Sequence, residues 1–237
     1  DKMFFNASSF NQSIGSWDVS SVGSMSSMFR FASNFNQPLG DWDVSSVTVM
    51  AYMFYHAHAF NQPVGDWNVS AISNMSHMFV QAHEFNQTLG NWNVSNVSEM
   101  SRMFSHARSF NQNLSNWKLN TNVTMTGIFQ PAAALSISNK AAIHYAFKNN
   151  PKWTTDWSSY IGSTPLTDSN FQTAVNLWFS DEANATATYG HISDWNTSAV
   201  TSMYAAFKDR ILFNEDISAW DVSNVTNMAQ MFTAAHS

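Results

Sequence analysis

A 25-residue repeat constrains this chain more than any other feature. Phenylalanine recurs at this interval, tryptophan recurs seven residues after it, and methionine and a second phenylalanine follow in the same register. The aligned residues are Phe10, Phe35, Phe60, Phe85 and Phe110; Trp17, Trp42, Trp67, Trp92 and Trp117; Met25, Met50, Met75, Met100 and Met125; and Phe29, Phe54, Phe79, Phe104 and Phe129. Such a period is typical of a solenoid, in which stacked coils share one core that no single coil could form.

Each unit combines two hydrophobic patterns. Trp42 and Val44 flank a polar residue, and this alternation predicts a short strand with one face turned inward. Met50, Met53 and Phe54 follow at spacings of three and four, which predicts one stripe of a short helix. We therefore expect an α/β repeat with one short parallel strand and one short helix per coil.

The full unit resembles a known repeat. From Phe35 to Phe54 it reads Phe-Asn-Gln-Pro-Leu-Gly-Asp-Trp-Asp-Val-Ser-Ser-Val-Thr-x-Met-x-x-Met-Phe. This unit resembles the BspA-like leucine-rich-repeat surface proteins, in particular their 25-residue-repeat group. The resemblance implies a leucine-rich-repeat-like solenoid and an extracellular or surface-attached protein used in adhesion or recognition. It implies no reaction.

The repeat divides the chain into three regions. Residues 1–132 form a first array, residues 192–237 form a second, truncated array, and residues 133–191 lose the pattern. Two helices are predicted in the middle region, one containing Ala142, Ile143, Ala146 and Phe147, the other containing Phe171, Ala174, Val175 and Trp178 with Thr167 or Asp168 at its cap. The region either continues the stack as degenerate, helix-rich coils, which we favour, or is an inserted helical module.

Composition excludes several functions. Charged residues make up 11% of the chain and the net charge is −6, so no basic stripe is available for nucleic acid. No apolar run reaches the roughly 18 residues of a membrane span. Without cysteine the chain has no disulfides and no thiolate metal sites. Only Asp181, Glu182 and His191 are loose acid–base candidates, and their spacing matches no mechanism, so we do not expect an enzyme or a cofactor.

Polar residues between the inward positions form the candidate binding site. In-register strands about 4.8 Å apart would align them into ladders. The candidate ligand-binding residues are Asp18, Asp43, Asn68, Asn93, Ser45 and Ser70. The adjacent carboxylates of Asp18 and Asp43 are candidate Ca²⁺ ligands, because Ca²⁺ prefers oxygen. The alternative is a solvated strand face without a ligand.

Three further columns have a functional and a structural interpretation. The tryptophans could stack on sugars, and the paired methionines, such as Met25 and Met28, could bind a soft metal, but core packing is the favoured role of both. A histidine cluster is better explained by partly exposed positions near helix C-termini than by a metal site. Its members are His56, His58, His83 and His106.

An asparagine column is expected to satisfy turn backbone groups in coil after coil, because the amide both donates and accepts. Its members are Asn11, Asn36, Asn61, Asn86 and Asn111.

The chain is also rich in Asn-x-Ser/Thr sequons, which suggests a glycoprotein of the secretory route. The candidate acceptors are Asn6, Asn11, Asn68, Asn74, Asn86, Asn93, Asn96, Asn122, Asn184, Asn196 and Asn224.

Together these features predict an extracellular structural or adhesive repeat protein. Its extended surface would contact other proteins, glycans or copies of itself. The alternative is a specific carbohydrate- or Ca²⁺-binding surface protein, and an enzyme ranks third.

Overall fold

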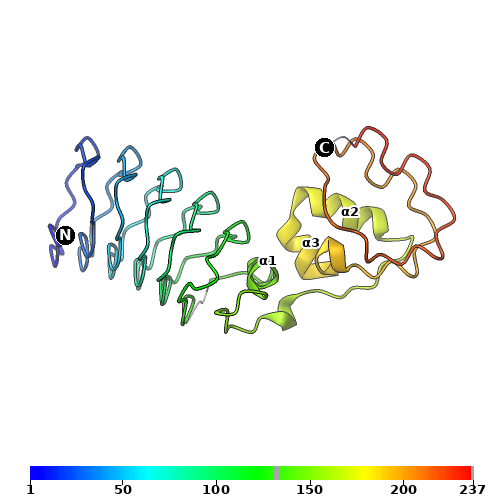
Figure 1. Cartoon of the computed structure of the whole chain (residues 1–237). Coiled ribbons are helices and arrows are strands. Elements are labelled where there is room, and N and C mark those ends of the chain that lie inside the picture. The colour runs from blue at the N-terminus through cyan, green and yellow to red at the C-terminus, as the bar shows by residue number, and fades with distance from the viewer. Residues whose placement is uncertain (131–133, 236–237) are drawn as a thin grey trace. The chain divides into compact units, whose positions relative to one another are not determined.

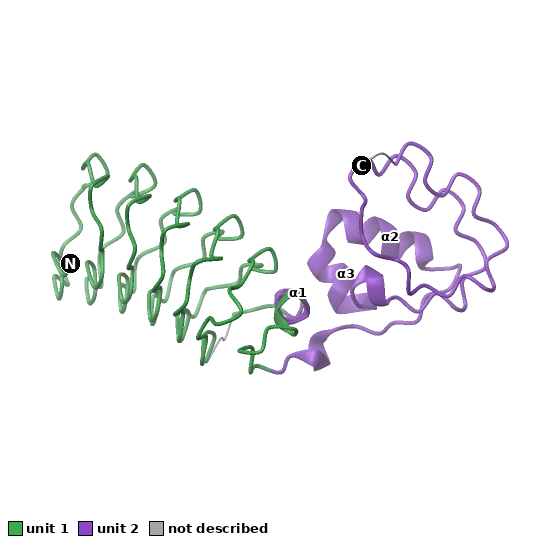
Figure 2. Cartoon of the chain, in the orientation of Figure 1, with its two compact units in different colours: residues 1–136, 146–155 green, residues 137–145, 156–237 purple. Residues whose placement is uncertain are grey.

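The computed structural model describes residues 1–130 and 134–235 (Figure 1). The chain forms two compact units, residues 1–136 with 146–155 and residues 137–145 with 156–237 (Figure 2). Helix α1 (Ile137–Phe147) contributes residues to both units. The predicted boundary at residues 132–133 lies outside the described residues.

The first unit is a stack of 25-residue coils joined by backbone hydrogen bonds. From Met25 to Phe31 every second N–H donates to a carbonyl of the next coil; Met25 donates to Val49 and Phe29 to Met53, each over 2.9 Å. The same pattern recurs from coil to coil up to the bond from Phe104 to Ile128. The coils therefore lie side by side in register, as Figure 1 shows.

The predicted leucine-rich-repeat-like solenoid, with a strand and a helix in every coil, is wrong. Among the described residues, pairing between coils reaches only isolated parallel bridges, such as Ser24 with Val49 and Val49 with Asn74. Trp42 and Val44 do face the core with an exposed Asp43 between them, as their alternation predicts. The backbone there forms a turn and no ladder of hydrogen bonds between strands, because the N–H of Trp42 donates to the carbonyl of Leu39 within the same coil.

The predicted helix in each coil is replaced by consecutive turns. The N–H of Met53 donates to the Met50 carbonyl three residues back. Every second N–H of the segment donates instead to a carbonyl of the next coil. The third residue of such a turn takes a positive φ, 60° at Tyr52 and 57° at His56. A right-handed helix requires φ near −63°, so these segments cannot be helical.

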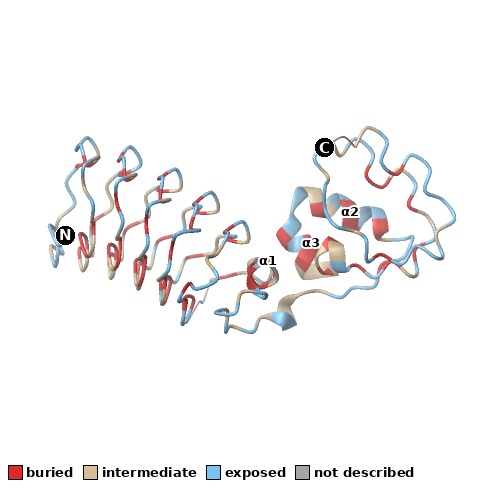
Figure 3. Cartoon of the chain, viewed as in Figure 1, coloured by how far each residue is buried: buried red, intermediate tan, exposed pale blue. Residues whose placement is uncertain are grey.

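The core of the first unit is a double column of phenylalanines. Phe54 and Phe60 stack within one coil at 3.9 Å between ring centroids, and Phe54 stacks on Phe79 of the next coil at 5.6 Å. All three rings are fully buried. Buried residues recur at equivalent places in successive coils, as Figure 3 shows, so the predicted core columns are confirmed in these positions.

The described helices all fall between residues 137 and 194. They are α1, the 3-10 helix Ser158–Tyr160, α2 (Phe171–Ser180), α3 (Glu182–Tyr189) and the 3-10 helix Ile192–Asp194. Both predicted helices are present as α1 and α2. The predicted cap of α2 at Thr167 or Asp168 is wrong, since Asn170 precedes the first helical residue.

The second unit has its own core. Phe171 and Trp178 of α2 pack with Trp195 and Trp220 of the following coils, and the two tryptophans stack at 5.9 Å. Bonds between coils resume here, from Met203 N–H to the Asn227 carbonyl.

Candidate binding surface

Side chains that leave the turns of the first unit form one continuous surface, which we call the turn face. Each member contacts at least one other through its ring or guanidinium group. Its members are Phe5, Arg30, Phe31, Tyr52, Tyr55, His56, His58, His77 and His83. The turn face therefore joins aromatic, imidazole and guanidinium groups from four successive coils.

The backbone holds several of these side chains in an unusual conformation. Phe31, Tyr52, His56 and His77 all have φ between 57° and 64°. The left-handed conformation costs a non-glycine residue roughly 1–2 kcal/mol. Glycine would avoid this cost and does occupy the equivalent place at Gly127. Large side chains at strained positions suggest a role for the side chains themselves.

Arg30 lies among four aromatic rings. Its guanidinium carbon is 4.8 Å from the ring centre of Tyr55, 4.9 Å from that of Tyr52, 5.2 Å from that of Phe31 and 5.7 Å from that of Phe5. Its Nε is buried and has no hydrogen-bond partner among the described residues. Cation–π attraction to the rings stabilises the charge in this position.

Two ring pairs continue the turn face along the stack. Tyr52 stacks on His77 of the next coil with ring centres 4.5 Å apart, and His58 stacks on His83 at the same distance. Nε2 of His58 and Nδ1 of His77 are buried without partners. The other nitrogen of each ring has no hydrogen-bond partner among the described residues either, and it is not buried.

The turn face disfavours further positive charge. Burial, followed by the neighbouring histidines and Arg30, lowers the pKa of His56. Burial, followed by Arg102, lowers the pKa of His77, and burial, followed by His58, lowers that of His83. The imidazoles of these three residues are therefore neutral near pH 7, where they both donate and accept hydrogen bonds.

The predicted polar ladder consists of local turns. Oδ1 of Asp18 accepts hydrogen bonds from the N–H and the hydroxyl of Ser20, at 3.0 and 2.6 Å. Oδ1 of Asp43 likewise accepts the N–H of Ser45 at 3.0 Å. Asn68 repeats the arrangement with Ser70, and Asn93 with Ser95. Each oxygen stabilises its own turn and is exposed, so the ladder is a row of separate turns.

Neighbouring donors stabilise the charged form of the two carboxylates, Asp18 and Asp43. Hydrogen bonds from Ser20 lower the pKa of Asp18, and bonds from Ser45 lower that of Asp43, outweighing the small opposite effect of Asp18. Among the described residues, no group of three or more His, Cys, Asp or Glu could hold a metal ion. The prediction that the histidine cluster lies near helix C-termini is wrong: His56, His58 and His83 are half-buried on turns, and His106 is exposed on a turn.

The asparagine column joins the coils as predicted. Oδ1 of Asn61 accepts the N–H of Asn86 at 3.0 Å and the side-chain amide of Gln87 at 2.8 Å. The same pair of bonds links Asn36 to the coil that follows it. Asn61 is half-buried, and its predicted bond to a backbone group is present.

The tryptophan and methionine columns belong to the core. Trp67 is 4% exposed, and Met25 and Met28 are buried, so none of them offers a surface for a ligand. Trp17 in the first coil is the exception, at 40% exposure.

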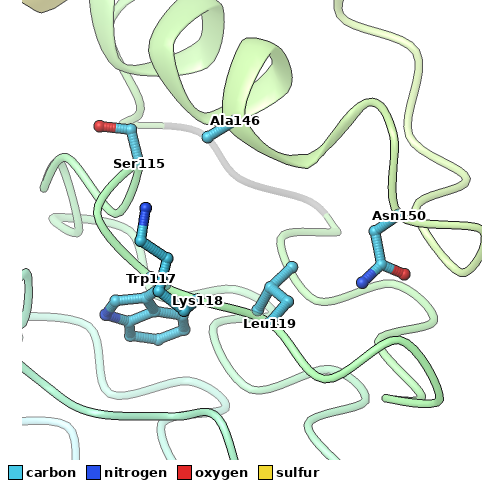
Figure 4. A pocket seen from close by; sticks show the side chains of 6 residues that line it. All are labelled: Ser115, Trp117, Lys118, Leu119, Ala146 and Asn150. Atoms are coloured by element: carbon cyan, nitrogen blue, oxygen red, sulfur yellow. The ribbon is translucent and has the colours of Figure 1, made fainter. Parts of the chain in front are cut away.

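Three shallow hollows lie next to the coils of the first unit. One has a volume of about 360 Å³ and is lined by Trp117, Lys118 and Leu119 on one side and by Ala146 and Asn150 on the other (Figure 4). Asn150 donates to the Asn120 carbonyl at 3.1 Å, which fixes this rim. A second hollow, of about 490 Å³, is lined by Asp18 and Asp41, and a third, of about 320 Å³, is lined by Asp66. None of the three combines acidic and basic side chains.

Two of the three acid–base candidates of the second unit, Asp181 and His191, have structural contacts. Oδ1 of Asp181 accepts the N–H of Asn184 at 3.0 Å and caps α3. His191 stacks on Tyr145 at 3.9 Å between ring centres. Burial, followed by Glu215, raises the pKa of Glu182.

The sequons lie at the surface of the structure. Asn74 is half-buried and the other ten asparagines are exposed. In Asn96 and Asn224 the side-chain amide nitrogen that would carry a glycan donates to a carbonyl of the preceding coil, at 2.6 and 2.8 Å. Glycosylation of the remaining nine stays a prediction.

Sequence reasoning missed Arg30, Phe31, Tyr52, Tyr55 and His77. A signal was present in the repeat itself, because these residues occupy columns that vary between coils while the flanking Met and Phe columns do not. One such column reads Ser27, Tyr52, His77, Arg102 and Gly127.

Comparison with known proteins finds one family model. Its description is "Mycoplasma protein of unknown function, DUF285", and it matches residues 1–83, 63–163 and 166–237. No curated protein and no solved structure matches the chain. The resemblance to BspA-like surface proteins, and the extracellular location that it implies, stay predictions.

Proposed function

This chain belongs to the family described as Mycoplasma protein of unknown function, DUF285, and, because that description assigns no activity, we propose from the structure that it is a non-catalytic repeat protein whose turn face binds a protein or glycan partner.

One observation carries the proposal. Tyr52, Tyr55 and His56 are half-buried on the outside of the stack, and none of their polar side-chain atoms has a hydrogen-bond partner among the described residues. Tyrosine and arginine are the residues that dominate binding interfaces, since they combine apolar area with hydrogen-bonding groups. Here they are held on turns tied to the neighbouring coils, so little side-chain and loop freedom remains to be lost on binding.

The other surfaces support this choice. The polar ladder uses its oxygens in its own turns, and the hollow of Figure 4 holds a single charged side chain, that of Lys118. No helix in the part of the chain that the structure describes is long and apolar enough to cross a membrane.

The test compares two double variants of the full chain on a glycan array and an array of purified proteins. Tyr55→Ser with His77→Ser removes two turn-face side chains. Asp43→Ser with Asn93→Ser removes two exposed side chains of the polar ladder and serves as the matched control. We expect a ligand of the wild-type chain to be lost by the first variant and kept by the second. Loss by the control, or retention by both, would place the binding surface elsewhere.

A further inference from the structure

Two stacked ring pairs join neighbouring coils of the turn face. The ring of His77 lies on that of Tyr52 with 4.5 Å between centres and 9° between planes, and the ring of His83 lies on that of His58 with 4.5 Å and 6°. Both pairs connect the same two coils. Two imidazolium rings at this distance repel each other. The stack of His58 on His83 therefore requires that at least one of the two rings is neutral.

Each stack also contains one ring nitrogen that is buried without a partner among the described residues, Nδ1 of His77 and Nε2 of His58. A neutral imidazole can leave such a nitrogen without a hydrogen, because its single N–H lies on the other nitrogen. An imidazolium carries a hydrogen on both nitrogens, and a buried N–H without an acceptor is destabilising. Either ring can therefore take up a proton only if it leaves its stack.

Most of the charged groups around these rings are positive. The column of His77 continues to Arg102 in the next coil, and the column of His83 continues to Arg108. Burial and these cations outweigh the nearby carboxylates, so the pKa values of His77 and His83 are lowered. The titratable and charged groups that face the histidines are Arg30, Arg102, Arg108, His56, His58, His106, Tyr52, Tyr55, Glu84 and Glu99.

We propose that the turn face is an acid-sensitive switch, in which protonation of His58, His77 and His83 at mildly acidic pH separates the two stacks, opens the turns that carry them and releases a bound partner. The release rests on the proposed function, whereas the opening follows from the stacks alone. The opening is local, because the core beneath these turns consists of uncharged columns such as Phe54 and Phe60.

Hydrogen–deuterium exchange of the full chain tests the opening. The exchange rate of each segment is measured at pH 7.5 and 5.5 and divided by its intrinsic rate at the same pH. We expect this ratio to rise about tenfold in acid for residues 52–58 and 77–83. Residues 203–209 of the second unit make the same backbone bonds to the next coil and contain no histidine, so their ratio should stay constant.

Two variants show whether the histidines cause the change. Phenylalanine in place of His58, His77 and His83 keeps a ring in each stack that cannot be charged, and it should abolish the rise. His106→Gln removes an exposed histidine of the same region and should leave the rise intact. If the phenylalanine variant does not fold, the comparison of the two segments with residues 203–209 in the wild-type chain still decides.

Three results of the exchange experiment would each overturn the switch. They are a constant ratio at residues 52–58 and 77–83, an equal rise at residues 203–209, and an undiminished rise in the folded phenylalanine variant. The glycan and protein arrays, probed with the wild-type chain at both pH values, test the release, and ligands bound at pH 7.5 should be lost at pH 5.5. Binding that does not change with pH would keep the proposed function and refute the switch. Opening without any ligand on the arrays would leave the switch standing while the proposed function falls.

Discussion

The indole N–H of Trp67 donates to the carbonyl of Leu39 in the preceding coil over 3.0 Å. The same bond joins Trp42 to Ile14, Trp92 to Val64 and Trp117 to Leu89. Each tryptophan therefore fills the core and gives a second hydrogen bond to a carbonyl that already accepts an N–H within its own turn.

Trp67→Phe should destabilise the protein by about 0.5–1.5 kcal/mol, because it keeps most of the ring but removes one of the two hydrogen bonds that the Leu39 carbonyl accepts. Trp67→Ala should cost about 3–5 kcal/mol, since it also opens a cavity. Urea unfolding followed by circular dichroism measures both. Trp17→Phe is the control, as Trp17 is 40% exposed, and an equal loss there would contradict this role of the bond.

Asn61→Leu should destabilise by about 1–3 kcal/mol, because the N–H of Asn86 and the amide of Gln87 lose their shared acceptor. Asn61→Asp keeps an oxygen at this position and should retain most of the stability. Thermal unfolding at pH 7 compares the two. A stabilising effect of leucine would show that the column adds nothing to the stack.

Gln81→Val should cost about 1–2 kcal/mol relative to Gln81→Gly, because φ is 55° at this half-buried residue and a β-branched side chain clashes there. The order is opposite to that expected in a helix interior or a strand, where glycine is the poorer residue. Chemical unfolding of both variants tests the turn assignment directly. If valine proved the better residue, the left-handed conformation would be refuted.

Calcium should leave the melting temperature unchanged, in the wild-type chain and in Asp18→Asn with Asp43→Asn. The carboxylates are already stabilised by Ser20 and Ser45, and asparagine oxygens can accept the same bonds. A Ca²⁺ titration monitored by differential scanning calorimetry gives the answer. A shift seen in the wild-type chain and lost in the variant would restore the calcium interpretation.

Stability should fall as the pH drops below about 6.5, the ordinary pKa of histidine. The folded pKa values of His56, His77 and His83 are lower than this, so the unfolded chain binds more protons in this range. A second loss belongs below the ordinary aspartate value of 3.8, where exposed carboxylates such as Asp18 and Asp168 give up their hydrogen bonds.

Melting temperatures measured from pH 7.5 to 5 should therefore decline in the wild-type chain. They should decline less in a variant with glutamine at all three histidines, and equal slopes would show that these groups do not control the transition.

The sequence by itself determined the period, the residues that face inward and the asparagine bonds. Burial of Phe54 and Trp67 follows from their recurrence every 25 residues, because an apolar column is stable only when neighbouring coils cover it. The helices α1 and α2 were likewise predictable from apolar spacing.

Tertiary structure alone decided the backbone of each coil and therefore the turn face. The spacing of Met50, Met53 and Phe54 suits a helix and a run of turns equally well. A helix would require the N–H of Tyr52 to bond to the carbonyl of Thr48, but that carbonyl accepts Ser73 of the next coil instead, and Tyr52 donates to Ser76. These partners lie about one repeat away in the sequence, so local propensity cannot reveal them. They turn the Tyr52 backbone left-handed and place its ring beside Arg30.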